Sequence, residues 1–188
     1  MQKMDKNPDN QLLSLAAQGD KLAYGMLYTQ YLNEIYRFVL FKVGSELTAE
    51  DITEEAFLKT WERLPKIYKK DGKIDNFRAW LYRTANNLVI DYYRKKKPVS
   101  NIDHTEPSHA AKPEELTQKH EVSRELTQSI KELDPESQQI ILLRVVNELP
   151  HKEIAKIMNI SEGNARVLLF RALKKLKEML KEKEGDHA

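Results

Sequence analysis

Cysteine is absent from this chain, and glycine and proline are scarce, with six and seven residues among 188. The lack of cysteine excludes a disulfide framework, a thiolate nucleophile and a cysteine-ligated metal or iron–sulfur site. So few turn-forming residues do not suit a sandwich or a barrel, which needs many tight turns. We therefore expect helices, in a protein of the reducing cytoplasm.

Long apolar runs are also missing. No stretch approaches the roughly 20 apolar residues that a helix needs to cross a bilayer, and the opening MQKMDKNPDNQ lacks the apolar core of a signal peptide. Hydrophobic residues make up 40% of the chain and charged residues 32%, enough for modest cores under a charged surface. The length suits one ordinary domain or two small ones, and we expect a soluble all-α protein of two small helical domains.

Charge is unevenly distributed, although the formal net charge is only +2. Residues 46–64 carry six acidic side chains against two basic ones, whereas residues 65–97 carry ten basic against three acidic. Residues 166–183 carry seven basic against two acidic. Two basic blocks suit phosphates and one acidic block suits a basic protein surface, with solvated helix faces as the alternative.

The N-terminal half predicts helices over residues 10–18, 20–43, 49–64 and 76–96. Apolar side chains recur at spacings of three and four, which is typical of a buried stripe. Gly19 can end the first helix and Asp20 can cap the second. We expect Thr48 to cap the third helix, Pro65 to stop it, and a basic loop to follow as far as Asp75, the cap of the fourth.

The C-terminal half begins with a segment of changed character, residues 98–121, which reads as a flexible linker between domains at 10–97 and 122–183. Helices are predicted beyond it over residues 122–133, 135–149, 151–158 and 162–183. Asp134 followed by Pro135 is a helix start, and Ser161 is the expected cap of the last helix.

The segment KEIAKIMNISEGNARVLLFR, residues 152–171, predicts a helix-turn-helix. Ala155 is small where two helices would cross closely, and Asn159 tolerates the positive φ that the turn requires. The side chains expected to fill the space between the helices are Ile154, Met158, Ile160 and Leu168. Those expected to face outward are Glu162, Asn164, Arg166, Val167, Phe170, Arg171, Lys174 and Lys175. The second helix would then enter a major groove; the alternative is a helical hairpin with a solvated basic face.

The predicted helix 76–96 mixes basic side chains with aromatic ones, namely Phe77, Trp80, Tyr82, Tyr92 and Tyr93. Arg83, Asn87 and Arg94 recur three or four residues apart on another face. Exposed aromatic rings beside arginines suit single-stranded nucleic acid, because bases stack on the rings. For Phe77 and Trp80 we instead expect packing against the helix 20–43.

The predicted helix 49–64 has two faces. Its inward residues are Ile52, Ala56, Phe57, Thr60, Trp61 and Leu64, and its outward residues are Asp51, Glu54, Glu55, Leu58 and Glu62. A leucine among acidic side chains suggests an interface with a basic helix, and a solvated acidic face is the alternative.

Features of an active site are missing from the sequence. The glycines form no phosphate-binding loop, and the five histidines lack metal-ligand spacing. We therefore expect no enzymatic activity, no cofactor and no bound metal.

Three segments in this order, AEDITEEAFLKTWERL, NFRAWLYRTANNLVIDYYRKKK and the helix-turn-helix, make the chain resemble an extracytoplasmic-function sigma factor of the sigma-70 family. The resemblance implies a bacterial transcription initiation subunit that binds core RNA polymerase and promoter DNA. Residues 10–97 would bind the polymerase and open the minus-ten element, and residues 122–183 would bind the minus-thirty-five element. A membrane-associated anti-sigma factor is a further implied partner, and we expect the free chain to be monomeric.

The resemblance also assigns site residues. The polymerase-facing set is Asp51, Glu54, Glu55, Leu58 and Glu62. The minus-ten set is Lys66, Tyr68, Lys69, Arg83, Asn87, Arg94 and Lys95, with the expected loop at 66–75 reading a flipped base beside Asn87. The minus-thirty-five set is Ser161, Glu162, Asn164, Arg166, Phe170, Arg171 and Lys174.

Four positions depart from the family pattern: Pro150 replaces the usual serine or threonine, Asn159 the usual glycine, and Val167 and Leu168 the usual serine and arginine. The last two remove a polar pair from the recognition helix. We therefore expect recognition through phosphates and groove shape, dominated by Arg166 and Arg171.

Two other functions compete with this one. A promoter-bound regulator would share only the helix-turn-helix and would have no use for the acidic, leucine-centred helix. A helical protein-interaction adaptor would not need affinity for DNA that falls steeply with salt. The linker of about 25 residues can span at most roughly 90 Å when fully extended. We therefore expect core polymerase to stretch the linker and hold both domains on the promoter. Without polymerase, we expect the isolated chain to bind promoters poorly, because its two domains do not bind at the same time.

Overall fold

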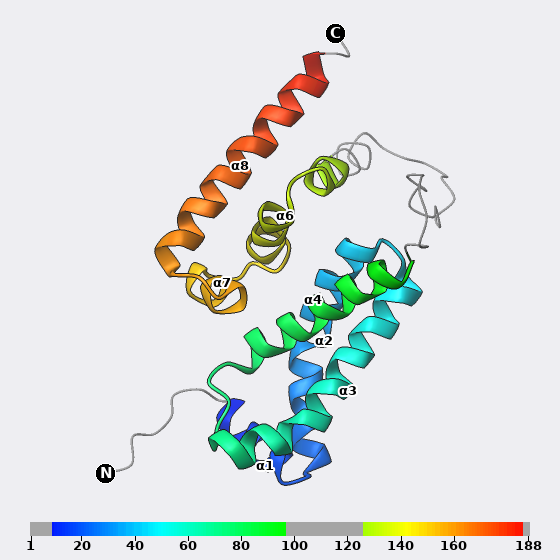
Figure 1. Ribbon diagram of the computed structural model, residues 1–188, viewed down its shortest axis with the longest axis vertical. Helices are drawn as coiled ribbons and strands as arrows, with labels where there is room; N and C mark the ends of the chain where they lie inside the picture. Colours follow the sequence, from blue (N-terminus) through cyan, green and yellow to red (C-terminus); the bar gives the residue numbers. More distant parts are fainter. Residues whose placement is uncertain (1–8, 97–125, 186–188) are drawn as a thin grey trace. The chain divides into compact units, whose positions relative to one another are not determined.

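The computed structural model describes residues 9–96 and 126–185, and these form two compact units (Figure 1). Every regular element in the described ranges is helical, which confirms the predicted all-α fold with two helical regions. The predicted linker at 98–121 lies outside the described residues. None of the described helices is both long and apolar enough to cross a membrane.

The N-terminal unit contains four helices: α1 (Asp9–Ala17), α2 (Lys21–Val43), α3 (Glu46–Asp71) and α4 (Phe77–Lys96). In Figure 1 the three long helices run alongside one another, and α1 lies at the end of the bundle where α2 begins and α3 ends. Fully buried large side chains of its core include Leu27, Ile35, Phe38, Leu64, Leu81 and Tyr82. The buried residues of α2 recur at helical spacing, at Ala23, Leu27, Tyr31 and Ile35, so this helix turns one stripe toward the others.

The ends of α1 and α2 follow the predicted capping pattern. Gly19 has a φ of 97°, in the left-handed region that glycine adopts without strain. The Asp20 carboxylate accepts hydrogen bonds from the backbone N–H groups of Leu22 (2.9 Å) and Ala23 (3.1 Å). Gly44 ends α2 with a φ of 70°. These caps satisfy backbone groups that the helix itself leaves unpaired.

The predicted limits of α3 are wrong at both ends. Ser45, not Thr48, is the N-cap: its hydroxyl accepts a hydrogen bond from the Thr48 N–H at 3.4 Å. The helix also continues through Pro65 and ends only at Gly72, which has a φ of 70°. Proline removes one backbone hydrogen bond, but Leu64 is fully buried beside it, and this packing offsets the loss.

The longer α3 means that most of the predicted basic loop is helix. Lys66, Tyr68 and Lys69 lie on the last turns of α3 rather than on a loop. The cap of α4 is also corrected: the Ala79 N–H donates to the Asn76 side chain at 2.6 Å, whereas Asp75 pairs with Lys73 at 3.0 Å. Asn76 and Asp75 are both good caps by type, so residue preference alone does not distinguish them.

A polar cluster ties α1 and α4 to α2. The Tyr31 hydroxyl donates to the buried Asp9 carboxylate, and the Gln30 side chain donates to the same group at 3.1 Å. From α4, the Arg78 guanidinium pairs with Glu34 at 3.1 Å and lies over the Tyr31 ring. Burial, followed by the hydrogen bond to Asp9, raises the pKa of Tyr31, which therefore stays neutral.

The C-terminal unit contains a helical stretch at 126–131, α6 (Pro135–Ile141), the π-helical segment η1 (Leu142–Val146), α7 (His151–Met158) and α8 (Glu162–Gly185). As predicted, Asp134 caps α6 by accepting from the Ser137 N–H at 3.0 Å. The predicted regular helix over 135–149 is wrong, because the Asn147 N–H bonds to the Leu142 carbonyl five residues back. The wider turn buries Leu142 and Leu143 together with Ile140 and Ile141, four consecutive side chains that a narrower helix face could not turn inward.

Candidate functional site

The acidic face of α3, defined as Asp51, Glu54, Glu55, Leu58 and Glu62, is exposed at all five positions. The Leu58 side chain is 55% exposed in the middle of these carboxylates. The Glu55 carboxylate pairs with Lys59 at 2.8 Å, an exposed i,i+4 pair that contributes little to stability. Opposite this face, the predicted inward residues are buried except Trp61, which is half-buried.

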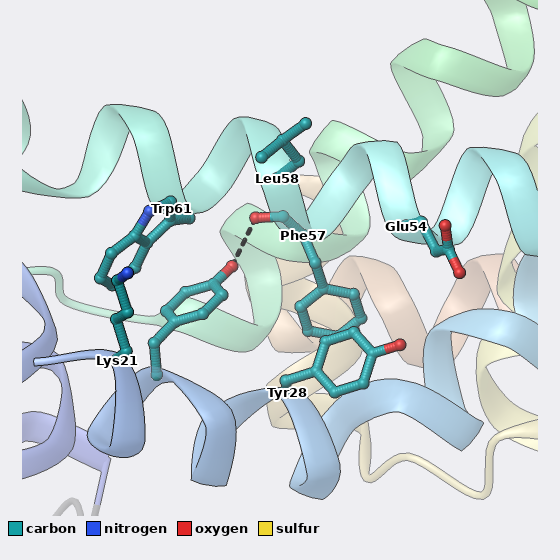
Figure 2. Close-up of a pocket in the computed structure, with 7 residues that line it drawn as sticks. Lys21, Tyr28, Glu54, Phe57, Leu58 and Trp61 are labelled. Carbon is teal, nitrogen blue, oxygen red and sulfur yellow. Dashed lines mark hydrogen bonds between the residues drawn. The ribbon is translucent and has the colours of Figure 1, made fainter.

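Beside Leu58 a groove of about 350 Å³ runs between α2 and α3 (Figure 2). Its walls are the aromatic side chains Tyr24, Tyr28, Phe57 and Trp61, joined by Leu58. Lys21 and Glu54 lie at opposite ends of the groove in Figure 2. The groove is therefore apolar along its length, with a positive charge at one end and a negative charge at the other.

Hydrogen bonds and ring contacts hold the walls of this groove in place. The Tyr24 hydroxyl donates to the Phe57 carbonyl at 2.5 Å and lies 2.7 Å from the Thr60 hydroxyl oxygen. Burial raises the pKa of Tyr24 to about 12, so this hydroxyl remains a donor at all physiological pH values. The ring centroids of Tyr24 and Trp61 are 4.8 Å apart, and those of Tyr28 and Phe57 are 4.7 Å apart. A surface ordered in this way loses little entropy when a partner binds.

The α2 wall of this groove was not predicted from the sequence. Tyr24 and Tyr28 lie four residues apart, a spacing that is also typical of a buried stripe. Both are half-buried in the structure and turn one ring face to the groove. The residue type could have indicated this exposure. A tyrosine at the edge of a helical stripe has a polar hydroxyl, which favours a partly exposed position.

The predicted minus-ten residues are spread over two helices rather than gathered around a loop. Arg83, Asn87 and Arg94 are exposed and share one face of α4. Lys95 is exposed at the next position, and Arg94 pairs with Asp91 at 3.0 Å. Eleven residues of helix separate the two arginines by about 16 Å. The α4 set therefore forms an elongated basic strip.

The three predicted minus-ten residues on α3 have different environments. Lys66 and Lys69 are exposed, while Tyr68 is half-buried and its hydroxyl donates to the Asn10 carbonyl of α1 at 3.4 Å. Tyr68 thus fastens the end of α3 to α1. The structure contains no base-reading loop at 66–71, because these residues are helical.

The aromatic residues of α4 divide between core and surface. Phe77 and Tyr82 are buried; the Phe77 ring contacts Tyr31 at 5.6 Å, and the Tyr82 ring contacts Phe38 at 5.0 Å. Trp80 is half-buried and lies 6.0 Å from Phe77, centroid to centroid. Tyr93 is exposed, and its hydroxyl donates to the Lys42 carbonyl at 2.7 Å. Stacking surface for a base is therefore concentrated at the C-terminal end of α4.

Lys42 is a further candidate that the sequence analysis missed. Its ammonium lies 5.0 Å over the Phe38 ring and donates to the Asn86 side chain at 3.0 Å, next to Asn87. Burial lowers the pKa of Lys42 from 10.5 to about 8. The hydrogen bond to Asn86 joins residues 44 positions apart, which no local pattern could indicate, whereas the contact with Phe38 is a local i,i+4 pair. Lys42 keeps its charge at neutral pH beside the basic strip of α4.

The charged form of Lys42 should lower the free energy of unfolding of the N-terminal unit at neutral pH and should do so less at high pH. The folded pKa is the lower one, so between about pH 8 and 10.5 the unfolded chain holds a proton that the folded chain lacks, and stability rises with pH. We expect Lys42→Met to stabilise the N-terminal unit by about 1–2 kcal/mol at pH 7, with the gain shrinking above pH 8. Urea unfolding of both proteins at pH 7 and pH 9.5 measures this; an equal gain at both values would contradict the assignment.

The helix-turn-helix has the predicted geometry. Asn159 has φ 57° and ψ 45°, in the left-handed region, and the Ile160 N–H bonds to the Ala155 carbonyl at 3.0 Å. The Ser161 hydroxyl caps α8 by accepting from the Asn164 N–H at 3.1 Å. Proline at 150 ends the preceding turn and opens α7 without a side-chain cap.

Part of the packing prediction for this motif is wrong. Ile154 and Ala155 are buried as expected, but Met158, Ile160 and Leu168 are only half-buried, and Ile157 and Leu169 take core positions. The reason is helical phase: the buried stripe of α8 repeats at Ala165, Leu169, Ala172 and Leu176.

The predicted minus-thirty-five residues all lie on the exposed surface of α8 or its cap. Phe170 is 70% exposed. The Arg166 guanidinium pairs with Glu162 at 2.6 Å, and Lys174 is 3.8 Å from Glu178. Lys175 is directed elsewhere, toward Asp134 at 3.4 Å. Within the described residues, no cluster of three or more histidine, aspartate or glutamate side chains could hold a metal ion.

Comparison with known proteins identifies both units. Residues 27–99 match the family described as Sigma-70 region 2, and residues 123–176 match Sigma-70, region 4. The ECF RNA polymerase sigma factor SigM of Bacillus subtilis is 31% identical over 164 residues, which cover 81% of this chain and 92% of SigM. The ECF RNA polymerase sigma factor BldN of Streptomyces coelicolor is 30% identical over 174 residues, which cover 90% of this chain and 65% of BldN.

Solved structures show the same fold. CnrH, in complex with the cytosolic domain of CnrY, aligns with a TM-score of 0.69 at 20% identity, covering 94% of this chain and 99% of CnrH. The sigma factor RpoE from Bartonella quintana, in complex with the anti-sigma factor NepR, aligns with a TM-score of 0.60 at 19% identity, covering 84% and 96%. The two matched regions and the SigM alignment show that this chain belongs to the ECF sigma factors of the sigma-70 family.

Proposed function

We propose that the chain acts as an RNA polymerase sigma subunit. Core polymerase binds the acidic face of α3, the basic strip of α4 engages the minus-ten element, and α8 enters the major groove at the minus-thirty-five element. The observation that carries this proposal is the exposure of all five acidic-face residues beside an ordered apolar groove. It supports a protein interface, because the carboxylates repel nucleic acid while the groove offers apolar contact area.

Binding of a partner to the acidic face of α3 would combine electrostatic attraction with apolar contact. Carboxylates at Asp51, Glu54, Glu55 and Glu62 steer a basic partner surface and exclude acidic ones. Leu58 and the groove beside it supply an apolar contact surface, and an apolar side chain from the partner can pack into this groove against the Tyr24 and Trp61 rings. We propose that a basic amphipathic helix of the polymerase occupies this surface.

Promoter opening needs no nucleotide hydrolysis by this subunit. Each stacked step costs about 1.4 kcal/mol to open, and a base that stacks on an exposed ring regains about 1–3 kcal/mol. Tyr93 offers such a ring, and Arg83, Asn87 and Arg94 lie along α4 for the backbone and an unpaired base. As a regulatory subunit the chain accordingly has no catalytic role of its own in this proposal.

Arg171 on α8 is assigned to a DNA phosphate. Arg171→Ala should weaken holoenzyme binding several-fold across all promoter sequences and reduce the slope of log affinity against log salt by about one. Binding titrations at three salt concentrations on two unrelated promoters measure both quantities. An altered base preference with an unchanged salt slope would assign Arg171 to a base instead.

Regulation by an anti-sigma factor is part of the proposal. Of the solved structures with this fold, RpoE is in complex with the anti-sigma factor NepR, and CnrH is in complex with the cytosolic domain of CnrY. The acidic face and its groove are the surface that such a partner would cover here, because covering it would also block polymerase. Purification of the chain from its native cells without any tight second protein would argue against this control.

One experiment tests the proposed function directly. The purified chain is added to core polymerase and a set of genomic fragments, and the starts of the transcripts are mapped. We expect new starts that require both the chain and the core enzyme. A DNA-binding regulator that is not a polymerase subunit would shift existing starts only when another sigma factor is present.

A further inference from the structure

The outward face of α8 is apolar at its centre. Val167 is 49% exposed and Phe170 is 70% exposed. They lie three residues apart, so they share a face, and this face is opposite the buried stripe that ends at Leu176. Phase alone therefore keeps both side chains away from the core of the C-terminal unit.

Cations flank this apolar pair. Arg171 follows Val167 by four residues and Lys174 follows Phe170 by four, so both share its face of the helix. This arrangement suits the major groove of DNA. The phosphates on either side of the groove would contact the cations, and the base edges at its floor include apolar methyl groups that would contact the apolar pair. This charge arrangement favours DNA over an apolar protein surface as the occupant.

Polar readout from this face is limited. The Arg166 guanidinium lies beside this face and forms an exposed i,i+4 ion pair with Glu162 at 2.6 Å. Valine and phenylalanine can neither donate nor accept a hydrogen bond, so opposite guanine, cytosine or adenine they would bury polar edges without partners. The only apolar group that a base presents in the major groove is the C5-methyl group of thymine.

We propose that Val167 and Phe170 determine specificity by contacting thymine methyl groups in the minus-thirty-five element. This inference rests on the proposed function, because it requires α8 to lie in the major groove. It replaces the expectation of recognition by phosphates and groove shape alone with a direct contact at defined base positions. The proposal predicts promoters whose minus-thirty-five element has thymines at the base positions that face the first two turns of α8.

Uracil in place of thymine gives a test at the level of one methyl group, because the two bases pair identically. Holoenzyme made from this chain and core polymerase first selects fragments from a pool with a randomised minus-thirty-five window. The selected fragments are then synthesised with thymine or with deoxyuridine in that window alone. We expect about a fourfold loss of affinity for each contacted methyl group that is removed.

Matched variants separate the proposal from its alternatives. Val167→Thr keeps the side-chain shape, and its combination with Phe170→Ala should weaken binding to thymine promoters while making affinity equal for thymine and uracil. Leu173→Ala removes another exposed apolar side chain of α8 away from this face, and it should leave the thymine preference intact. All of these positions are exposed, so melting temperatures should stay within a few degrees of the parent.

Each outcome has a defined meaning. Equal affinity of the parent holoenzyme for thymine and uracil windows, with binding that still depends on Arg171, would overturn the methyl contact and leave the proposed function standing. Holoenzyme that selects no minus-thirty-five sequence would overturn the proposed function itself. Loss of holoenzyme assembly in the double variant, with an unchanged thymine preference, would show instead that a protein covers this face.

Discussion

Run-off transcription should fall at least about 100-fold when the acidic face of α3 is reversed by Glu54→Lys, Glu55→Lys and Leu58→Asp. The two carboxylates are exposed, and Leu58 borders the groove. Repulsion of a basic partner and loss of the apolar anchor together exceed about 3 kcal/mol in interfaces of this kind. A 100-fold loss corresponds to about 2.7 kcal/mol.

The measurement compares the affinity for core polymerase with run-off RNA from a promoter found by mapping transcript starts. A control with the same two charge reversals exists on the same helix: Glu46→Lys with Glu50→Lys also replaces two glutamates by lysines, away from the acidic face and without the added aspartate. We expect this control to retain most of its activity. If the reversed variant transcribed as well as the wild type, the acidic face would not be the docking surface for polymerase. If both variants lost the same activity, the loss would be an effect of net charge and not of this face.

Phe38→Ala should destabilise the N-terminal unit by about 3–5 kcal/mol. Phe38 is fully buried, contacts the Tyr82 ring of α4 at 5.0 Å, and lies under the Lys42 ammonium. Its removal leaves a cavity between α2 and α4 that neighbouring helices cannot close. For a unit of this size the melting temperature should fall by about 15 °C or more.

Amide hydrogen exchange on the full chain is the appropriate readout, because it reports α2, α3 and α4 separately from α8. Phe41→Ala on the same helix is the matched control, since Phe41 is only half-buried and should cost well under half as much. Unchanged protection of α2 and α4 in Phe38→Ala would contradict the position of Phe38 between these helices.

Local chemistry was sufficient for much of the fold. Gly19, Asp20, Asp134, Asn159 and Ser161 act where the sequence placed them, because a cap or a left-handed residue depends on the few backbone groups beside it. The exposure of the acidic face and of the α8 face also follows from spacing alone. A helix has one phase, and apolar spacing reveals which side is buried.

Local rules failed where packing outweighed a residue's own preference. Pro65 should stop a helix, yet α3 continues because Leu64 is buried beside it and Tyr68 bonds to Asn10 in α1. The π-helical turn at 142–146 arises in the same way, from four consecutive apolar side chains that must all face inward. The first error moved site residues: residues 66–71 of the base-reading loop predicted at 66–75 are helical.

Spacing, capping residues and blocks of charge in the sequence by themselves determined the all-α class, the helix-turn-helix and which face of each helix meets solvent. Tertiary structure alone decided which faces lie side by side: the groove of Tyr24, Tyr28 and Trp61, the half-buried Lys42 beside Asn86, and the helical end of α3. The physical reason is the distance along the chain over which each interaction acts. Backbone caps and helical phase act over a few residues, whereas a groove or a desolvated charge depends on side chains that only the packed core brings together.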